Sequence, residues 1–252
     1  MEFLNQVVLI TGASRGIGRA CAVEFAEKGA RVAVHYNRNQ AAGRETLSVL
    51  SGGPHMLVQA DVSQADEVKK MMEEVAGKWG RIDVLVNNAG VFEEHPPLET
   101  DYNTWHERWK RTIETNLTGS AHAAYWAART MKKEGGGRII NVTSRGAFRG
   151  EPDAPAYGAS KAGQNALSQS LAKALAPHNI FVFAVAPGWV ETDMAMDSLS
   201  GPGGEEIKKQ SPLGRAARPE EVARAVVFLA SGGTDYMTGC ILDVNGASYL
   251  RT

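Results

Sequence analysis

Short apolar runs alternate with longer amphipathic segments along almost the whole chain, and this alternation restricts the fold more than any other feature. Each run is rich in β-branched or other aliphatic residues and ends near Gly, Asp, Asn or Pro, which is typical of strands buried on both faces. Alternating strands and helices indicate βαβ units and a mostly parallel sheet. The expected strands are residues 7–10, 31–35, 56–59, 84–86, 138–142, 181–185 and 241–244.

The segments between these runs have the spacing of helices that bury one face. In 19–28 the apolar residues recur at helical spacing and stop before Gly29, a residue type common just after a helix. A second helical pattern stops before Gly77 and consists of Val68, Met71, Met72 and Val75.

The 252 residues contain no internal repeat and no linker rich in Pro, Ser or Gly, so we expect one domain over residues 1–252. The longest segment without a strand or helix pattern is 193–214, which contains four consecutive turn-forming residues at 201–204. Because a long loop within a compact domain usually has a function, we predict that 193–214 is a substrate lid.

Charge and composition argue against several classes of protein. The formal net charge is −1, from 27 basic and 28 acidic residues, which removes the main electrostatic reason to expect a nucleic acid or a membrane surface as partner. No window approaches the roughly 20 apolar residues of a membrane span, and the acidic start is unlike a signal peptide. The six histidines never stand in H-x-x-x-H spacing, so we expect no metal site of that kind. Cys21 and Cys240 cannot form a disulfide framework, which favours a reducing, cytoplasmic location.

A glycine-rich segment follows the first expected strand directly and leads into a helix. Glycine lets the backbone turn tightly and approach a pyrophosphate, whose charge then meets the helix N-terminus. Strand-to-helix turns without a ligand can have the same pattern, but the strand and helix context favours dinucleotide binding. The residues expected to cradle the cofactor are Gly12, Ser14, Arg15, Gly16, Ile17 and Gly18.

The end of the second strand indicates which nicotinamide cofactor to expect. Sites for NAD usually have an acidic residue there for the ribose 2′-hydroxyl, whereas this chain has Asn37 and Arg38 and no carboxylate. Arg38 and Arg15 suit a 2′-phosphate, which a guanidinium can bind in bidentate fashion. The alternative is that Arg38 is a solvated loop residue. We predict NADP(H) rather than NAD(H), with Asp61 and Val62 near the adenine.

Tyr157 and Lys161 are four residues apart, a spacing that places both side chains on one face of a helix. A free tyrosine has a pKa near ~10, and a nearby ammonium lowers that pKa, which would let the phenol exchange protons near neutral pH. Taken alone, the pair is more typical of a solvated helix face than of a catalytic pair. Ser144 adds weight, because it follows a strand thirteen positions earlier, although a serine there can also cap a turn.

Several motifs agree in order and spacing with one family. The chain resembles the tyrosine-dependent short-chain dehydrogenase/reductase family almost from end to end. Near the C-terminus it is most similar to the 3-oxoacyl-carrier-protein reductases, at Leu213-Gly214-Arg215, at Pro219-Glu220-Glu221-Val222 and at Thr238-Gly239. The other matching motifs are Thr11-Gly12-x-x-x-Gly16-x-Gly18, Asn87-Asn88-Ala89-Gly90, Asn116, Ser144, Tyr157-x-x-x-Lys161, and Pro187-Gly188 followed by Thr192.

The resemblance implies a single-domain Rossmann fold, doubly wound, with a mostly parallel seven-stranded sheet and helices on both faces. It implies that NADPH delivers hydride to a carbonyl carbon of a 3-oxoacyl thioester or a smaller ketone, and that Tyr157 protonates the oxygen. Lys161 then lowers the tyrosine pKa and binds the nicotinamide ribose, Ser144 binds the carbonyl oxygen, and Asn116 holds a water that relays protons to Lys161 from a helix irregularity. The remaining cofactor residues are Asn88, Ala89 and Gly90 at the adenine ribose, and Pro187, Gly188, Val190 and Thr192 at the nicotinamide amide.

The resemblance also implies a homotetramer, built through helices around 117–133 and 159–175 and through the last strand. An acyl carrier protein is a further partner of some relatives, which place basic residues beside the cleft. Gly135 and His178 stand at those positions here, and this argues against a carrier protein.

Residues 91–109 depart from the family pattern, because they are about four residues longer and rich in aromatic side chains. They either reshape the substrate pocket or form a surface loop that packs its own aromatics. Trp189 is expected either to pack against the nicotinamide or to form a wall of the pocket. Met194 and Met196 either line an adaptable apolar site or cover core.

Two other functions stay open. The same residues acting in reverse would make an oxidative dehydrogenase of a sugar, a polyol or a secondary alcohol. A cofactor-binding regulator without chemistry is the other alternative, and the presence of Asn116, Ser144, Tyr157 and Lys161 together argues against it.

Overall fold

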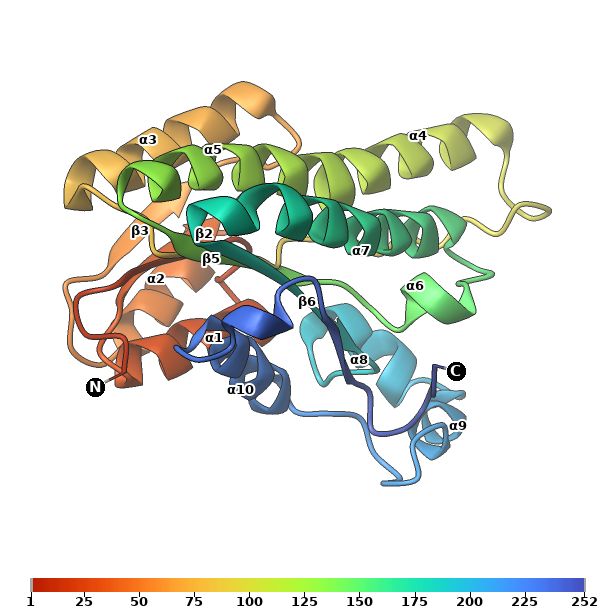
Figure 1. Cartoon of the computed structure of the whole chain (residues 1–252). Helices are drawn as coiled ribbons and strands as arrows, with labels where there is room; N and C mark the ends of the chain where they lie inside the picture. Colours follow the sequence, from red (N-terminus) through yellow and green to blue (C-terminus); the bar gives the residue numbers. More distant parts are fainter. Residues whose placement is uncertain (1, 252) are drawn as a thin grey trace.

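Seven strands form one parallel sheet in the computed structural model, which describes residues 2–251 (Figure 1). Their order across the sheet is β3-β2-β1-β4-β5-β6-β7. All seven predicted strands are present, and four of them run further than predicted, because backbone pairing continues into residues such as Pro187 that an apolar pattern does not mark. The strands are β1 (Val7–Ile10), β2 (Arg31–Tyr36), β3 (Met56–Gln59), β4 (Val84–Asn87), β5 (Gly137–Val142), β6 (Ile180–Pro187) and β7 (Ile241–Val244).

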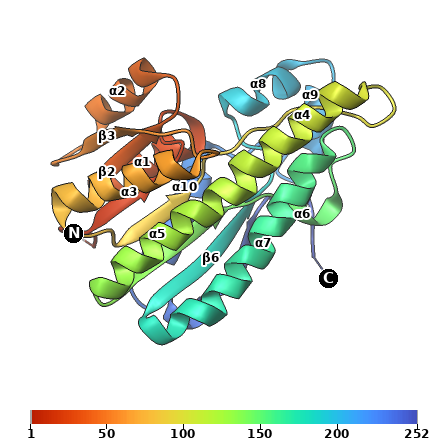
Figure 2. The ribbon, with the colours of Figure 1, turned by 90° about the horizontal axis from the view of Figure 1, so that it is seen from above.

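Helices cover both faces of the sheet. On one face α1 and α10 pack against strand residues such as Val8 and Phe183, and on the other α3, α5 and α7 pack against residues such as Leu9 and Ile139. Figure 2 shows α3, α5 and α7 lying across the same face. The helices are α1 (Gly16–Glu27), α2 (Gln40–Val49), α3 (Ala65–Trp79), α4 (Tyr102–Thr112), α5 (Gly119–Lys133), α6 (Gly146–Arg149), α7 (Pro155–Leu175), α8 (Asp193–Ser200), α9 (Gly204–Lys209) and α10 (Pro219–Ala230).

The structure corrects two sequence-based boundaries. The segment 193–214 is not irregular, because it contains α8 and α9, which bury Ala195 and Leu199 against Trp189. These helices are too short for their periodicity to stand out from the surrounding glycines. The first helix begins at Gly16 rather than at residue 19, so the glycine turn itself supplies its first turn.

The order in which the chain adds strands to the sheet reverses at β1, whose two neighbours are β2 and β4. The connections on either side of this point run in opposite directions, which leaves a crevice beyond the carboxyl ends of the strands, and ligands of such folds bind there. Thr11 fastens the crevice, because its Oγ1 accepts hydrogen bonds from the backbone N–H groups of Asn88 and Ala89, both at 3.0 Å. The predicted doubly wound α/β fold is therefore confirmed, with a sheet that is parallel throughout.

None of the helices within residues 2–251 combines the length and the apolar character needed to cross a bilayer.

Candidate active site

A cleft of about 470 Å³ opens at the reversal point of the sheet. Most of the predicted cofactor residues line it, together with Ser144, Tyr157 and Lys161 of the predicted chemical centre. Three predicted residues lie elsewhere: Gly18, Asp61 and Asn116. The predicted cofactor residues on the cleft wall are Gly12, Ser14, Arg15, Gly16, Ile17, Asn37, Arg38, Val62, Asn88, Ala89, Gly90, Pro187, Gly188, Val190 and Thr192.

The glycine turn is packed so closely that side chains would not fit. Gly12 has a φ of +64°, and a Cβ there would lie 3.0 Å from the Cα of Ala89. A Cβ on Gly18 would lie 2.3 Å from the carbonyl oxygen of Gly12. Gly18 therefore contributes to the turn through close packing of the helix against it and does not itself line the cleft.

His35 supports this turn from beneath. Its Nδ1 accepts a hydrogen bond from the backbone N–H of Gly12 at 2.8 Å, so Nε2 carries the hydrogen and donates it to the carbonyl oxygen of Ala60 at 2.9 Å. Burial lowers the pKa of His35 to about 4, and the hydrogen bond to Ala60 opposes this only in part. The neutral imidazole is thus a structural part of the turn, a role that the sequence alone did not reveal.

Two arginines stand at the predicted 2′-phosphate position. Arg15 forms an ion pair with Asp193 of α8 at 3.3 Å, but both side chains are about two-thirds exposed, and such a pair contributes little. Arg38 forms no ion pair within residues 2–251. Asp61 does not line the cleft, but Val62 does. The Asp61 carboxylate accepts hydrogen bonds from the N–H and the hydroxyl of Ser63. Burial opposes the lowering of its pKa, which the hydrogen bonds and the nearby Asn37 and Arg38 produce.

Helix α7 carries Tyr157 and Lys161 into the cleft from one face, as predicted. Burial raises the pKa of Tyr157 to about 12, hydrogen bonding with Ser144 acts in the opposite sense, and the charge of Glu151 raises the pKa further. The lowered tyrosine pKa that the resemblance implies is therefore not found in this arrangement. The Nζ of Lys161 lies 5.7 Å from the centre of the Tyr157 ring.

Lys161 is itself buried and firmly held. Its Nζ donates hydrogen bonds to the carbonyl oxygen of Val142 at 2.9 Å and to Oε1 of Gln164 at 2.8 Å. An ammonium has three hydrogens, so one remains for a ligand. Burial lowers the pKa of Lys161 to about 7.

Asn116 lies in a π-helical segment, η1 (Ile113–Thr118), between α4 and α5, where a helix irregularity was expected. Its side chain is fully used, because it exchanges hydrogen bonds with the backbone of Val91 and donates one to Ser160. The backbone carbonyl oxygen of Asn116 accepts a hydrogen bond from the hydroxyl of Ser120 at 2.8 Å.

Gln164 joins this segment to the lysine. Its Nε2 donates to the Ser120 hydroxyl at 2.7 Å while its Oε1 accepts from Lys161. Two side chains, Ser120 and Gln164, thus link the backbone of Asn116 to Lys161. The sequence held a signal for Gln164, since it is a polar residue one helical turn after Lys161.

The substrate side of the cleft is formed by segments whose geometry the sequence did not predict. Phe92 meets Tyr157 edge to face, with ring centres 5.0 Å apart. His95 pins the same segment to α7, because its backbone N–H donates to the carbonyl oxygen of Asp153 and its Nε2 accepts from the N–H of Ala156. Trp105 and Trp109 stack on each other beside His95. Val91 and Phe92 line the cleft, so this part of 91–109 reaches the pocket. The expectation of a surface loop is wrong for Trp105 and Trp109, because both lie in α4.

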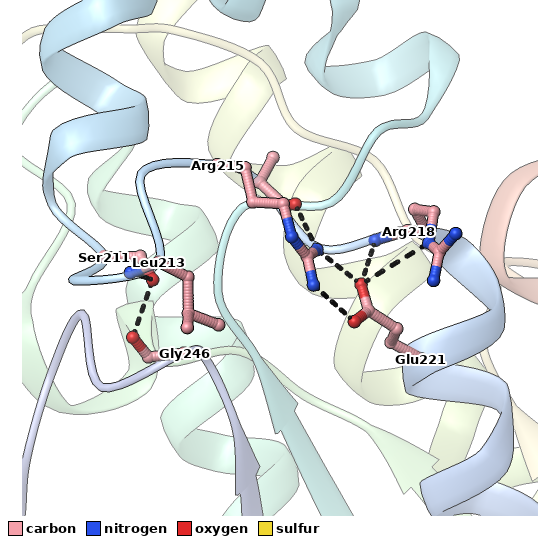
Figure 3. Close-up of polar contacts among 7 residues, drawn as sticks. Ser211, Leu213, Arg215, Arg218, Glu221 and Gly246 are labelled. Atoms are coloured by element: carbon pink, nitrogen blue, oxygen red, sulfur yellow. Dashed lines mark hydrogen bonds and ion pairs between the residues drawn. The ribbon is translucent and has the colours of Figure 1, made fainter.

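The predicted lid is anchored at its C-terminal end (Figure 3). Arg215 donates two hydrogen bonds of 2.7 Å to the carboxylate of Glu221 at the start of α10, and the hydroxyl of Ser211 donates to the carbonyl oxygen of Gly246. Met194 lines the cleft, and Met194 and Met196 are about half exposed. Trp189 lines the cleft wall, as expected.

Comparison with known proteins agrees with this geometry. A family model described as "Enoyl-(Acyl carrier protein) reductase" matches residues 12–247. The chain belongs to the short-chain dehydrogenase/reductase family. It is 38% identical over 249 residues to the 3-oxoacyl-(acyl-carrier-protein) reductase FabG of Staphylococcus aureus, covering 98% of this chain and 99% of that protein.

Two further relatives extend the comparison. The 3-oxoacyl-(acyl-carrier-protein) reductase of Synechocystis is 39% identical over 244 residues, covering 96% of each chain. A solved structure of a variant of a Serratia marcescens short-chain dehydrogenase/reductase superposes with a TM-score of 0.90 at 30% identity, covering 98% of this chain and 99% of that one. The protein is therefore an oxidoreductase of this family.

Proposed function

We propose that the protein is an NADPH-dependent reductase of carbonyl compounds, acting on a 3-oxoacyl thioester or a related ketone. The observation that carries the proposal is that Ser144, Tyr157 and Lys161 line the same cleft as the glycine turn. The similarity to proteins named 3-oxoacyl-(acyl-carrier-protein) reductase supports the same class of reaction.

The residues of the cleft suit a dinucleotide that carries a 2′-phosphate. The turn at Gly12 leaves room for a pyrophosphate to approach the backbone, and Arg15 and Arg38 offer two cations where an NAD site would have a carboxylate. Arg15 gives up only an exposed ion pair to bind a phosphate. Bound NADPH would supply the hydride that is added to the carbonyl carbon.

Tyr157 donates the proton that the carbonyl oxygen takes up, so that the product is an alcohol. Its raised pKa of about 12 suits this direction, because the phenol stays protonated at neutral pH and an alkoxide is a much stronger base. Ser144 orients the carbonyl by donating a hydrogen bond to its oxygen. After the transfer, the nearby ammonium of Lys161 stabilises the tyrosine phenolate.

The oxidative alternative, a dehydrogenase of a sugar, polyol or secondary alcohol, needs Tyr157 as a base. Burial raises the pKa of Tyr157, which suits a proton donor, and reduction is the direction that we propose. The decisive experiment follows the absorbance of NADPH and NADH with acetoacetyl-CoA, an acetoacetyl carrier protein, simple diketones and, in the oxidative direction, several sugars and alcohols. We expect NADPH oxidation with the acetoacetyl thioesters or ketones. Equal catalytic efficiency with NADH would overturn the cofactor assignment, and activity with alcohols alone would overturn the reductive direction.

We also propose that the protein is a homotetramer, as the resemblance implies, with α5, α7 and β7 at the contacts. Light scattering at micromolar concentration should then give four times the chain mass of 27.0 kDa. A monomer would contradict the proposal.

A further inference from the structure

Arg145 is a charged residue in the substrate half of the cleft to which the proposed reaction gives no role. It follows Ser144 directly, and its backbone N–H donates to the carbonyl oxygen of Pro187 at 2.9 Å. The residue is only 3% exposed. Arg145 and Trp189 together separate the main cleft from a smaller cavity of about 160 Å³.

The guanidinium of Arg145 is poorly satisfied. Within residues 2–251 its one hydrogen bond runs from Nη2 to Oε1 of Gln210, after α9, and its Nη1 is buried without a partner. No carboxylate of the described residues lies within ion-pair distance of it. Glu151 attracts it from further away, but that carboxylate is already paired with Arg149 at 3.3 Å, and Arg149 repels Arg145.

A buried guanidinium without a counter-charge lowers the stability of the fold unless a ligand pairs with it. Burying a charge without a counter-charge is strongly unfavourable, and removing one partner of a buried pair leaves the same kind of penalty. The pKa of Arg145 is lowered to about 10 by burial and by Arg149, so the side chain still carries its positive charge at neutral pH. The other arginine of the substrate half, Arg111, is paired with Glu93 at 2.7 Å and is 56% exposed.

We propose that Arg145 binds a carboxylate of the substrate, so that the preferred substrates are oxo acids rather than neutral ketones. This inference rests on the proposed function. Within the proposed class it favours ketones that carry a free carboxylate over 3-oxoacyl thioesters, whose acyl carbon is bound to sulfur. A carboxylate is a stronger partner for a guanidinium than the neutral amide of Gln210, so it displaces that amide and reaches the buried nitrogen. Gln210 belongs to the lid segment, so binding of the acid also breaks the hydrogen bond between Arg145 and the lid.

The anion is a carboxylate close to the reacting carbonyl rather than the phosphate of a thioester handle. Arg145 is buried and adjoins Ser144, whereas the phosphate of a long pantetheine arm lies many bonds from the carbonyl and reaches solvent.

The test compares acids with their methyl esters: acetoacetate, levulinate and 5-oxohexanoate, each with NADPH. In the wild type we expect kcat/KM for the best acid to exceed that of its ester by about tenfold or more. Arg145→Met should lose about 10- to 100-fold for the acid, the size of a charged hydrogen bond, and less than about threefold for the ester. Arg145→Lys should recover part of the preference.

Arg111→Met is the matched control, because it removes a cleft arginine that already has a counter-charge; its acid-to-ester ratio should stay within about twofold of wild type. Equal losses for acid and ester in Arg145→Met, or no acid preference in the wild type, would overturn the inference while the proposed function stands. A loss confined to acetoacetyl-CoA would assign Arg145 to the phosphate instead and would equally overturn it.

A second measurement separates this inference from the proposed function. If no ketone is reduced, the proposed function fails, and binding decides the inference. Thermal unfolding with NADP⁺ and 5-oxohexanoate should then show stabilisation in the wild type but not in Arg145→Met. Absence of stabilisation in the wild type would overturn the inference as well.

Discussion

The two sides of the cleft are built in different ways. The cofactor side consists of backbone held by close contacts. Gly12 packs against Ala89 and donates its N–H to His35. The side chain of Asn88 donates to the carbonyl oxygens of Thr11 and Gly12. The substrate side consists of side chains from 91–109, from Ser144, Arg145 and Glu151, and from the lid, several of them exposed. Backbone geometry tolerates few substitutions, whereas side chains can change without disturbing the fold. This difference explains how one architecture keeps its cofactor while its substrates vary.

The sharpest test of the division is Tyr157→Phe, which removes one hydroxyl where the two sides meet. We expect kcat for NADPH-dependent reduction to fall by about 10³-fold or more, because the proton donor is gone. The Kd for NADPH, measured by fluorescence titration, should change less than about threefold. Turnover close to wild type would exclude the proposed mechanism, and a large loss of NADPH affinity would show that the two sides are not separable.

A second test addresses the support beneath the glycine turn. Because the pKa of His35 is lowered from 6.5 to about 4 in the folded protein, the unfolded chain binds more protons between these values. The stability that the neutral His35 contributes is complete above pH 6.5 and is lost as the pH falls toward 4. Urea unfolding should show a loss of about 2 kcal/mol from His35 between pH 7 and pH 5. In His35→Gln this part of the pH dependence should disappear; an unchanged dependence would contradict the assignment.

A third test uses two glycines in helices. Gly18→Ala places a Cβ 2.3 Å from the carbonyl oxygen of Gly12 and should cost about 1–3 kcal/mol of stability and weaken NADPH binding. The matched control is Gly77→Ala in α3, where a Cβ meets nothing within 4 Å; it should stabilise the helix by up to about 1 kcal/mol. Thermal unfolding of both variants is the measurement. Similar effects at the two positions would mean that the turn is less tightly packed than described.

The smallest expected effect concerns the link behind the lysine. Replacing Gln164 by Met removes an acceptor of the Lys161 ammonium and therefore favours the neutral lysine. The alkaline decline of kcat for reduction, expected above about pH 7, should then begin at lower pH. Asn165→Leu is the control, because the buried amide of Asn165 has no hydrogen-bond partner within residues 2–251 and its removal should leave the profile in place. A pH profile that is the same in all three proteins would show that Gln164 has only a packing role.

Sequence patterns were sufficient to predict the sheet, and they pointed to a glycine turn and to Ser144, Tyr157 and Lys161, which line one cleft in the structure. These features depend on local rules: buried strands read as apolar runs, tight turns need glycine, and a spacing of four residues places Tyr157 and Lys161 on one helix face. The chain also carried enough spaced motifs to indicate its family, which the comparisons confirm.

Tertiary structure decided what depends on distance in space and on burial. Two hydrogen bonds join segments far apart in the chain: the one from Gly12 to His35 and the one from Gln164 to Ser120. The burial of Arg145 Nη1 without a partner likewise depends on distant segments. No spacing rule reports such contacts. The raised pKa of Tyr157 has the same origin, because the cost of a buried charge depends on everything packed around it, and a sequence does not state what that is.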